Sequence, residues 1–435
     1  MSAAPIVESA EAAVRDPVTL RLQETLVWLG SLAVPGEPTG HGDVVEDAAR
    51  IDRIALAEKL QAAIEAVKAT QIVRFAKSQA ETQMAEGVHP SKIGRGVADQ
   101  VALAGRVSPS EGSRRLHTAR DLCLSMPRML RLLAAGEISG WTARLITQQT
   151  SHLDPATRQQ VDADLAGQNP ASMSPKQAET AAKRLAYEAD PEAAMRRCRK
   201  ARTDRRVTLR PAPDTMSLLS GLLPVEQGVA CLAALQAAAT QGQAAGDQRS
   251  WGQLMADTLV ERITGQTTAD DIATEVAIVI PVGALLDPDD PSPAEVADLG
   301  PIPAGLAREI IANGQARSWW RRLFTRPTRA GGQIVVDLDQ RRRRFTGWLG
   351  ELIRLRDLHC RDPYCDAPVR HVDHIDRHTD GGPTTLHNGR GVCERGNYVR
   401  EMPGWSVHLV DPDTHTVITT TPTGHQYSSR PPQPP

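Results

Sequence analysis

The stretch Leu358–Trp405, LHCRDPYCDAPVRHVDHIDRHTDGGPTTLHNGRGVCERGNYVREMPGW, decides the fold of the C-terminal part of the chain. Within it, VRHVDHI is typical of a short strand ending at Asp373 and His374, and DGGPT is typical of a turn. CERGNYVREM is typical of a short helix that Pro403 and Gly404 stop. A strand, a turn-rich loop and a helix in this order predict that the end of the strand lies beside the helix.

Four side chains of this stretch suit the hydrolysis of a phosphodiester, which needs an activated water, neutralisation of the growing charge and help for the leaving oxygen. Asp373 offers a hard oxygen ligand for Mg²⁺ or Mn²⁺, and His374 is of the residue type that takes a proton from water near neutral pH. Asn397 can supply a second oxygen to the same ion, and Asn388 can hold the imidazole in its working orientation. The pattern predicts a hydrolytic site with one catalytic divalent ion.

The same residues carry a resemblance: VDHI, a Gly-Gly-Pro turn, an Asn and a helix that starts at a Cys are similar to the HNH endonuclease motif. The resemblance implies a ββα-metal nuclease module over residues 346–410 and an HNH endonuclease that hydrolyses phosphodiester bonds in DNA. It implies that His374 is the general base, Asp373 and Asn397 are metal ligands, and Asn388 orients the base. The third motif position is Asn here where many members have His, and either side chain can ligate the ion.

Cys360, Cys365 and Cys393 resemble the zinc knuckle that supports many HNH modules. Such a site has four tetrahedral ligands, and the position expected for the fourth is Gly396. Two outcomes stay open. The three thiolates could hold Zn²⁺ together with a histidine such as His359 or a water, or they are what is left of an eroded site.

Basic charge is concentrated just before this stretch. The whole chain carries a formal charge of −2, but residues 315–360 hold eleven arginines against four acidic residues. Arg341, Arg342, Arg343 and Arg344 form an uninterrupted run, for which we expect contacts with DNA phosphates. The alternative for this run is a solvated linker.

The resemblance extends upstream through SPSEGSRRLHTARDL, LLAAGEIS, ADTLVERITG, LGPIPAGLAREI and LIRLRDLHCRDPYC. These segments are similar to the bacterial HNH proteins with a long helical domain of unknown function, the DUF222 or 13E12-repeat family. The likeness covers nearly the whole chain except its two tails. It implies an HNH nuclease whose N-terminal domain has an unsettled role.

Aromatic residues make up only 3% of the 435 residues, which favours a core of Leu, Val, Ile and Ala in packed helices. The predicted fold is mainly α, with a small α+β middle subdomain and the C-terminal module. The predicted parts are a disordered N-terminus (1–18), a helical DUF222-like domain (19–202), its α+β part with the Arg-rich linker (203–345), the HNH domain (346–410), and a C-terminal strand with a tail disordered from about Thr420 (411–435).

In the helical part, Ser108, Pro109 and Glu111 have the spacing of a capping box that opens a second helix after a short turn. A plain helical hairpin is one interpretation. The other is a DNA-reading helix-turn-helix with Arg114, Arg115 and Arg120 on phosphates. Three further cysteines, at positions 123, 198 and 231, lie in apolar helical text, and we expect them to be buried.

No apolar run is long enough for a membrane span, and the N-terminal text lacks the order of a secretory signal, so we expect a cytoplasmic protein with no membrane partner. The expected partner is DNA, and a homodimer is plausible because cutting both strands usually takes two copies of such a module. Two alternatives stay open: a DNA-binding protein with a decayed, non-cleaving module, and a module that cuts RNA.

Overall fold

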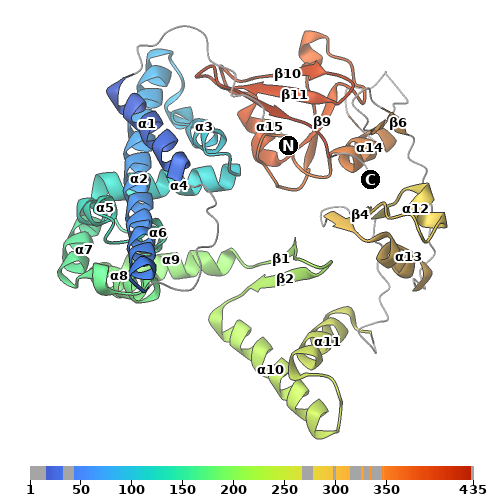
Figure 1. Cartoon of the computed structure of the whole chain (residues 1–435), viewed down its shortest axis with the longest axis horizontal. Coiled ribbons are helices and arrows are strands. Elements are labelled where there is room, and N and C mark those ends of the chain that lie inside the picture. Colours follow the sequence, from blue (N-terminus) through green and yellow to red (C-terminus); the bar gives the residue numbers. More distant parts are fainter. Residues whose placement is uncertain are drawn as a thin grey trace. The chain divides into compact units, whose positions relative to one another are not determined.

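The computed structural model describes residues 16–32, 44–266, 278–296, 300–313, 325–327, 333–335, 345 and 347–432. Within these ranges the chain is mostly helical with small antiparallel sheets, as the composition predicts (Figure 1). It divides into two compact units. One contains the described residues up to Asp190 with Met402–Ser406 and Thr420–Tyr427, and the other contains the rest.

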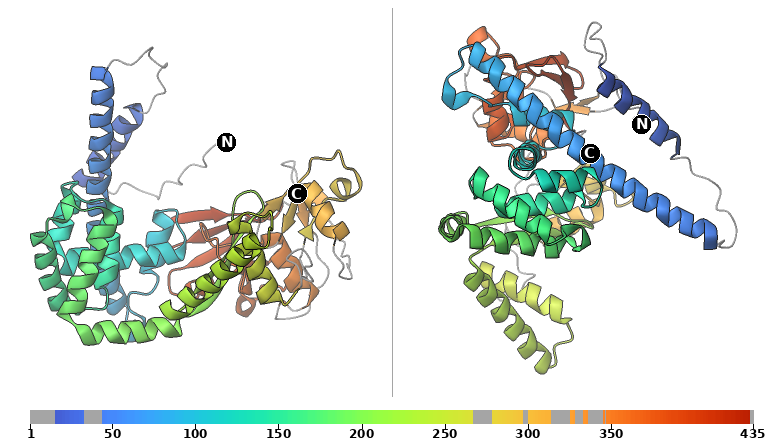
Figure 2. Two further views of the ribbon diagram at one scale, coloured as in Figure 1. Left: turned by 90° about the horizontal axis from the view of Figure 1, so that it is seen from below. Right: turned by 90° about the vertical axis from the view of Figure 1, so that its left-hand side faces the viewer.

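The first unit is built from helices, of which α2 is much the longest (Figure 2). Ser108, Asp154 and Ser174 each cap a helix whose first residue is proline, which explains why these helices begin where they do. Apolar side chains from α2, α4, α5, α6, α7 and α8 form the core. The helices are α1 (Pro17–Leu32), α2 (Val44–Ala85), α3 (Val97–Ala104), α4 (Pro109–Ser125), α5 (Pro127–Ala134), α6 (Gly140–Thr150), α7 (Pro155–Gly167), α8 (Pro175–Ala189), η1 (Pro90–Lys92) and η2 (Pro170–Ser172).

Helices α3 and α4 form a tight hairpin. A Cβ at Gly112 would lie 2.3 Å from the carbonyl oxygen of Ala98, so only glycine lets the two helices approach this closely. Ser108 caps α4 as predicted, but the carboxylate of Glu111 pairs with Arg114, with Arg115 and with an arginine of α6. Two of the arginines expected on phosphates are therefore paired within the unit, which favours the plain hairpin.

The middle of the chain has the predicted alternation of strands and helices. Strands β1 and β2 pair antiparallel, and α10 and α11 pack against each other. The elements here are α9 (Pro191–Thr203), β1 (Arg206–Pro211), β2 (Ser217–Leu222), α10 (Val225–Ala244), α11 (Trp251–Thr264), β3 (Ile278–Val279), α12 (Val282–Leu286), β4 (Ala294–Val296), β5 (Gly300–Ile302), α13 (Ala304–Asn313), β6 (Thr325–Pro327) and β7 (Gln333–Val335).

The prediction that the three scattered cysteines are buried is wrong for two of them. Cys198 and Cys231 are exposed, and Cys123 is half-buried. The reason is that α10 buries a single residue, Ala239, and α9 buries only two alanines, so apolar text in these helices does not mean a covered face.

The C-terminal part places two short strands and a helix together. Strands β8 and β9 pair antiparallel, with His371 opposite Val392 and His374 opposite Gly389, and α15 packs against both. The elements are α14 (Trp348–Asp357), β8 (His371–His374), η3 (His378–Asp380), β9 (Gly389–Val392), α15 (Glu394–Val399), β10 (Ser406–Asp411), β11 (Thr416–Thr420) and β12 (Gln426–Ser429). The sequence pattern predicted β8 and α15 but not β9.

The disorder predicted for the two tails is tested only at the residues that the structure describes. Residues 1–15 lie outside the described residues, but α1 already begins at Pro17. The prediction of disorder from about Thr420 is wrong, because β12 joins a sheet with β10 and β11. Arg361 donates to the Ser429 carbonyl at 3.1 Å and the Ser429 hydroxyl donates back to the Arg361 carbonyl at 2.6 Å, a long-range pairing that local composition does not reveal.

A buried charged network fastens α14 to β9. The carboxylate of Asp357 is fully buried and accepts hydrogen bonds from Arg356 (2.7 and 2.9 Å), from Arg361 (3.0 Å) and from the Gly391 amide (2.6 Å). Burial alone would raise the pKa of Asp357, but the two arginines outweigh it and hold the pKa at about 2. Arg356 was counted in the basic segment, but its guanidinium is committed to this network and not to phosphate.

His415 completes the same network. Its Nδ1 lies 3.2 Å from Arg361 Nη1, and its Nε2 lies 3.0 Å from the His387 carbonyl oxygen. Burial lowers the pKa of His415 to about 3, helped by the nearby arginine charges, so the imidazole is neutral. A neutral ring can donate through Nε2 and accept through Nδ1, which fits both contacts.

A search of the described helices finds none whose length and hydropathy would let it cross a bilayer.

Candidate functional site

Asp373 lies at the end of β8 with both carboxylate oxygens engaged. Oδ1 accepts the backbone N–H of His374 at 2.8 Å, and Oδ2 pairs with Arg400 at the C-terminal end of α15. The guanidinium of Arg390 on β9 is 3.7 Å from Oδ2. The side chain is still 19% exposed, so the carboxylate reaches the surface between two arginines.

The imidazole of His374 is held on several sides. Its Nε2 lies 2.9 Å from the hydroxyl oxygen of Thr384, which is buried in the loop between η3 and β9. The ring of Phe345 packs against it with the centroids 4.4 Å apart, and the exposed His378 meets it edge-on at 5.5 Å. These contacts fix the plane of the ring, which is what a general base needs.

Asn388 holds the loop and not the imidazole directly. Its Oδ1 accepts the Asp376 amide at 2.7 Å, and its Nδ2 donates to the carbonyls of Asp376 (2.9 Å) and Pro383 (2.8 Å). Both amide hydrogens are therefore used on the loop backbone. Because Pro383 precedes Thr384, Asn388 positions the hydroxyl that contacts His374.

Asn397 lies on α15, which packs against β8 and β9. Residues three apart on a helix share a face, and Arg400, three residues further on, reaches Asp373. The face of α15 that carries Asn397 is thus turned toward Asp373, and the side chain of Asn397 is half-buried there. The structure brings Asp373, His374 and this face of α15 to one end of the β8–β9 pair.

Three residues of this site were not predicted from the sequence. Thr384 was read only as part of a turn, and Arg390 and Arg400 carry no motif that distinguishes them from surface arginines. Arg390 is fully buried; its Nη1 donates to Asp362 at 2.9 Å, and its Nε and Nη2 lack a hydrogen-bond partner among the residues described. Arg400 also donates to the Ile375 carbonyl.

The histidines near the site differ in exposure. His371 and His378 are exposed. His387 is half-buried, and its Nδ1 is buried without a hydrogen-bond partner among the described residues. Arg341, Arg342, Arg343 and Arg344 lie outside the described residues.

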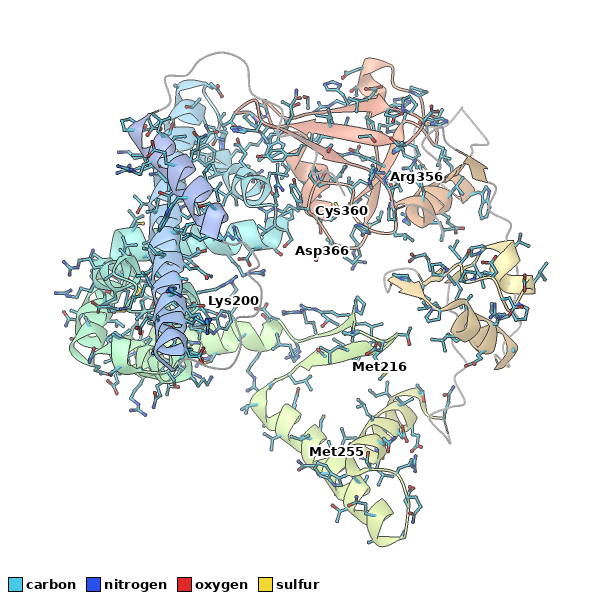
Figure 3. All side chains as sticks on the ribbon, viewed as in Figure 1. Lys200, Met216, Met255, Arg356, Cys360 and Asp366 are labelled. Atoms are coloured by element: carbon cyan, nitrogen blue, oxygen red, sulfur yellow. The ribbon has the colours of Figure 1, made fainter. Side chains whose placement is uncertain are left out.

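Cys360, Cys365 and Cys393 form a buried cluster beside the site. Their sulfur atoms lie within 4.8 Å of one another. Among the described residues, this is the one group of three or more cysteines, histidines or carboxylates that lie close enough together to hold a metal ion. His359, the histidine suggested as a fourth ligand, is exposed and outside this group. Figure 3 labels Cys360 and the nearby Asp366.

Backbone amides already donate to these sulfur atoms, as in metal sites whose thiolates are stabilised by N–H···S contacts. Cys393 N lies 3.2 Å from Cys360 Sγ, and Gly396 N lies 3.3 Å from Cys393 Sγ. Hydrogen bonds among the three sulfurs lower the pKa of Cys393 and raise the pKa of Cys360. Three soft sulfur ligands in one buried cluster suit Zn²⁺.

The other donor set, Asp373 with Asn397, consists of hard oxygens and suits Mg²⁺ or Mn²⁺, which take few protein ligands. The carboxylate has lone pairs beyond those used by the His374 amide and Arg400, because an ionised carboxylate accepts about four hydrogen bonds. The residues present therefore fit a catalytic divalent ion, with Arg400 as a competitor for Asp373.

Comparison with known proteins finds a family model that matches the helical part of the chain. The family model described as "Domain of unknown function (DUF222)" matches residues 51–281, which is more than half of the chain. Uncharacterized protein Rv2100 of Mycobacterium tuberculosis (strain ATCC 25618 / H37Rv) is 32% identical over 154 residues, covering 33% of this chain and 25% of that protein. Uncharacterized protein Rv3776 of the same strain is 33% identical over 146 residues, covering 32% of this chain and 25% of that protein.

The matched part thus spans about a quarter of the length of these relatives. No solved structure matches the chain. The family model alone covers more than half of the sequence, and the chain therefore belongs to the DUF222 family.

Proposed function

We propose that the β8–β9–α15 unit is an HNH nuclease module and that the protein is a metal-dependent endonuclease acting on DNA. The observation that carries the proposal is the meeting of Asp373, His374 and the Asn397 face of α15 at one end of a two-stranded hairpin. A carboxylate and an imidazole beside a helix that carries an amide are groups that hydrolysis of a phosphodiester can use.

Each side chain has a role that follows from its contacts. His374 takes the proton from the attacking water, and Thr384 holds its ring through the 2.9 Å contact at Nε2. Asn388 is a positioning residue that fixes the loop bearing Thr384. Asp373 and Asn397 would hold one Mg²⁺ or Mn²⁺, which when bound supplies positive charge to the phosphate and the leaving oxygen.

When no metal ion is bound, the guanidinium of Arg400 forms an ion pair with the carboxylate of Asp373. A cation that binds Asp373 has to share or displace the contact with this guanidinium. A released guanidinium at the edge of the site is suited to a phosphate oxygen, which it can bind in a forked, charge-assisted geometry. We therefore propose that Arg400 binds a phosphate oxygen when the substrate is bound. Arg341–Arg344 are proposed to bind the DNA backbone further away.

The test is nicking of supercoiled plasmid by the purified full chain with Mg²⁺ or Mn²⁺, with EDTA as the metal-free control. We expect His374→Ala to lower the rate by roughly 10²–10⁴-fold, the usual contribution of a general base. His371→Ala is the matched control, since this exposed histidine lies on the same strand. No cutting by the wild type, or equal cutting by both variants, would overturn the proposal.

A second candidate is a DNA-binding protein whose module no longer cuts, and the pairing of Arg400 with Asp373 favours it. In that case a guanidinium replaces the cation permanently. Salt-sensitive DNA binding that His374→Ala leaves unchanged, with no turnover under any metal, would select this second function. The same experiments on single-stranded RNA test the third interpretation, cleavage of RNA.

A further inference from the structure

The glycine at position 396 faces a carboxylate. A Cβ built on Gly396 would lie 1.8 Å from Oδ2 of Asp362, which is about the length of a carbon–sulfur single bond. The oxygen therefore lies at the distance from this Cβ that the sulfur of a cysteine would have. The fourth position of the cysteine cluster is vacant in the sequence, but in the structure its space is filled by Asp362.

Asp362 is tied to the cluster through its backbone as well. Its N–H donates to Cys360 Sγ at 3.5 Å, and it is two residues from that cysteine. Asp362 is not within 4.8 Å of all three sulfur atoms, so ligation requires the carboxylate to turn toward them. Arg390 donates to the other oxygen, Oδ1, at 2.9 Å, while Oδ2 is the oxygen that lies beside Gly396.

The charge of a carboxylate at this place is offset by Arg390, so Asp362 adds no more net charge than a fourth cysteine thiolate would. Three thiolates and a carboxylate carry four negative charges, Zn²⁺ removes two, and the fully buried Arg390 removes one more. An arginine that donates to a ligand carboxylate is the kind of outer contact that orients metal ligands. When no cation is bound, the three closely packed sulfurs and Asp362 cannot all stay ionised, because like charges at this distance repel each other.

We propose that Asp362 is the fourth ligand of a structural zinc site with Cys360, Cys365 and Cys393. The site is a tetrahedral set of three sulfurs and one oxygen, and Gly396 is small because the carboxylate of Asp362 takes its side-chain space. The proposal concerns structure and does not depend on nuclease activity, so the two can fail separately.

The first measurement is the zinc content and zinc affinity of the purified full chain, by elemental analysis and by competition with a chromophoric chelator. We expect one zinc per chain, and for Asp362→Ala a loss in affinity of at least roughly 10–100-fold, which is the effect of removing an outer partner of a metal ligand. Asp366→Ala is the matched control: it removes the same charge from an exposed carboxylate that follows Cys365, labelled in Figure 3, and Asp366 is not among the atoms that a Cβ on Gly396 would meet. Its affinity should equal that of the wild type.

A rescue separates ligation from the loss of the Arg390 ion pair. In Asp362→Ala combined with Gly396→Cys, the pair is still missing but a fourth thiolate is supplied in the space that the carboxylate leaves. We expect the zinc affinity to return to within about threefold of wild type, since four thiolates form a complete tetrahedral set. With Co²⁺ in place of zinc, the sulfur-to-cobalt charge-transfer absorption should rise from a three-sulfur to a four-sulfur level.

Three results would each overturn the proposal. They are a wild type that neither carries nor takes up zinc, an affinity of Asp362→Ala equal to that of wild type, and a double variant no better than Asp362→Ala. Hydrogen exchange over residues 347–432 verifies that each variant is folded. A variant found unfolded is replaced by Asp362→Ser, whose short side chain also frees the space beside Gly396 and for which the same loss and the same rescue are expected.

Discussion

The substitution Asp357→Asn tests the buried network that holds the candidate site together. The carboxylate accepts four hydrogen bonds, three from the guanidinium groups of Arg356 and Arg361 and one from the Gly391 amide. Asparagine keeps the shape but removes the charge, and it leaves two buried guanidinium groups without their counter-ion. Breaking a buried ion pair in this way costs about 3–5 kcal/mol.

The loss is measured by hydrogen exchange of the full chain, followed at peptides from β9 and α14. Since about 1.4 kcal/mol corresponds to a factor of ten, exchange of the Gly391 amide should accelerate by roughly two to three and a half orders of magnitude. Asp366→Asn is the matched control; an exposed carboxylate is expected to change stability by less than about 0.5 kcal/mol. A change below about 1 kcal/mol for Asp357→Asn would refute the central place given to this network.

Three further outcomes are expected. Thr384→Val should slow plasmid nicking by roughly tenfold or more and alter its pH profile, while hydrogen exchange stays at the wild-type level; an unchanged rate and profile would remove its positioning role. Acid should destabilise the C-terminal part: burial lowers the pKa of His415 from 6.5 to about 3, so between these pH values the unfolded chain binds a proton that the folded protein does not. Stability is then complete above pH 6.5 and falls by up to about 1.4 kcal/mol for each pH unit below it, which denaturant titrations across this range will detect. Replacing all four arginines 341–344 by serine should reduce the slope of log affinity against log salt by roughly 3–4 in DNA-binding titrations, and an unchanged slope would exclude them as phosphate contacts.

The helices and the strand–turn–helix order could be predicted because their signals are local. The capping serine and the first-turn proline of α4 lie within four residues of each other, and the apolar spacing in α2 repeats along a single helix. In the same way VRHVDHI shows a strand by alternation alone. Local patterns of this kind fix where an element begins and which residues it carries.

Strand β9 could not be predicted, since its text, GRGV, is poor in the branched and aromatic residues that indicate strands. It is a strand because β8 offers hydrogen-bond partners and because Asp357 binds the Gly391 amide. The arginines of this region illustrate the same limit. Arg356 and Arg361 look like surface charges in the sequence, and only tertiary structure shows that they are buried on one carboxylate.

The residues of the candidate site also divide into those that local sequence reveals and those that only tertiary contacts reveal. Asp373, His374, Asn388 and Asn397 can be named from spacing, but the contact of Thr384 with His374 depends on how the loop folds back. The relation of Asp362 to Gly396 is equally invisible in the sequence, where 34 positions separate them. Local sequence thus predicts which groups are present, and tertiary contacts decide which of them act together.

The central claim is that one divalent cation binds between β8 and α15. Crystals of the full chain soaked with Mn²⁺ and measured at the manganese absorption edge test it most directly. We expect an anomalous peak about 2.1 Å from oxygens of both Asp373 and Asn397, with His374 beside it and Arg400 moved away from Asp373. Ordered side chains with Arg400 still on Asp373 and no peak at saturating Mn²⁺ would contradict it.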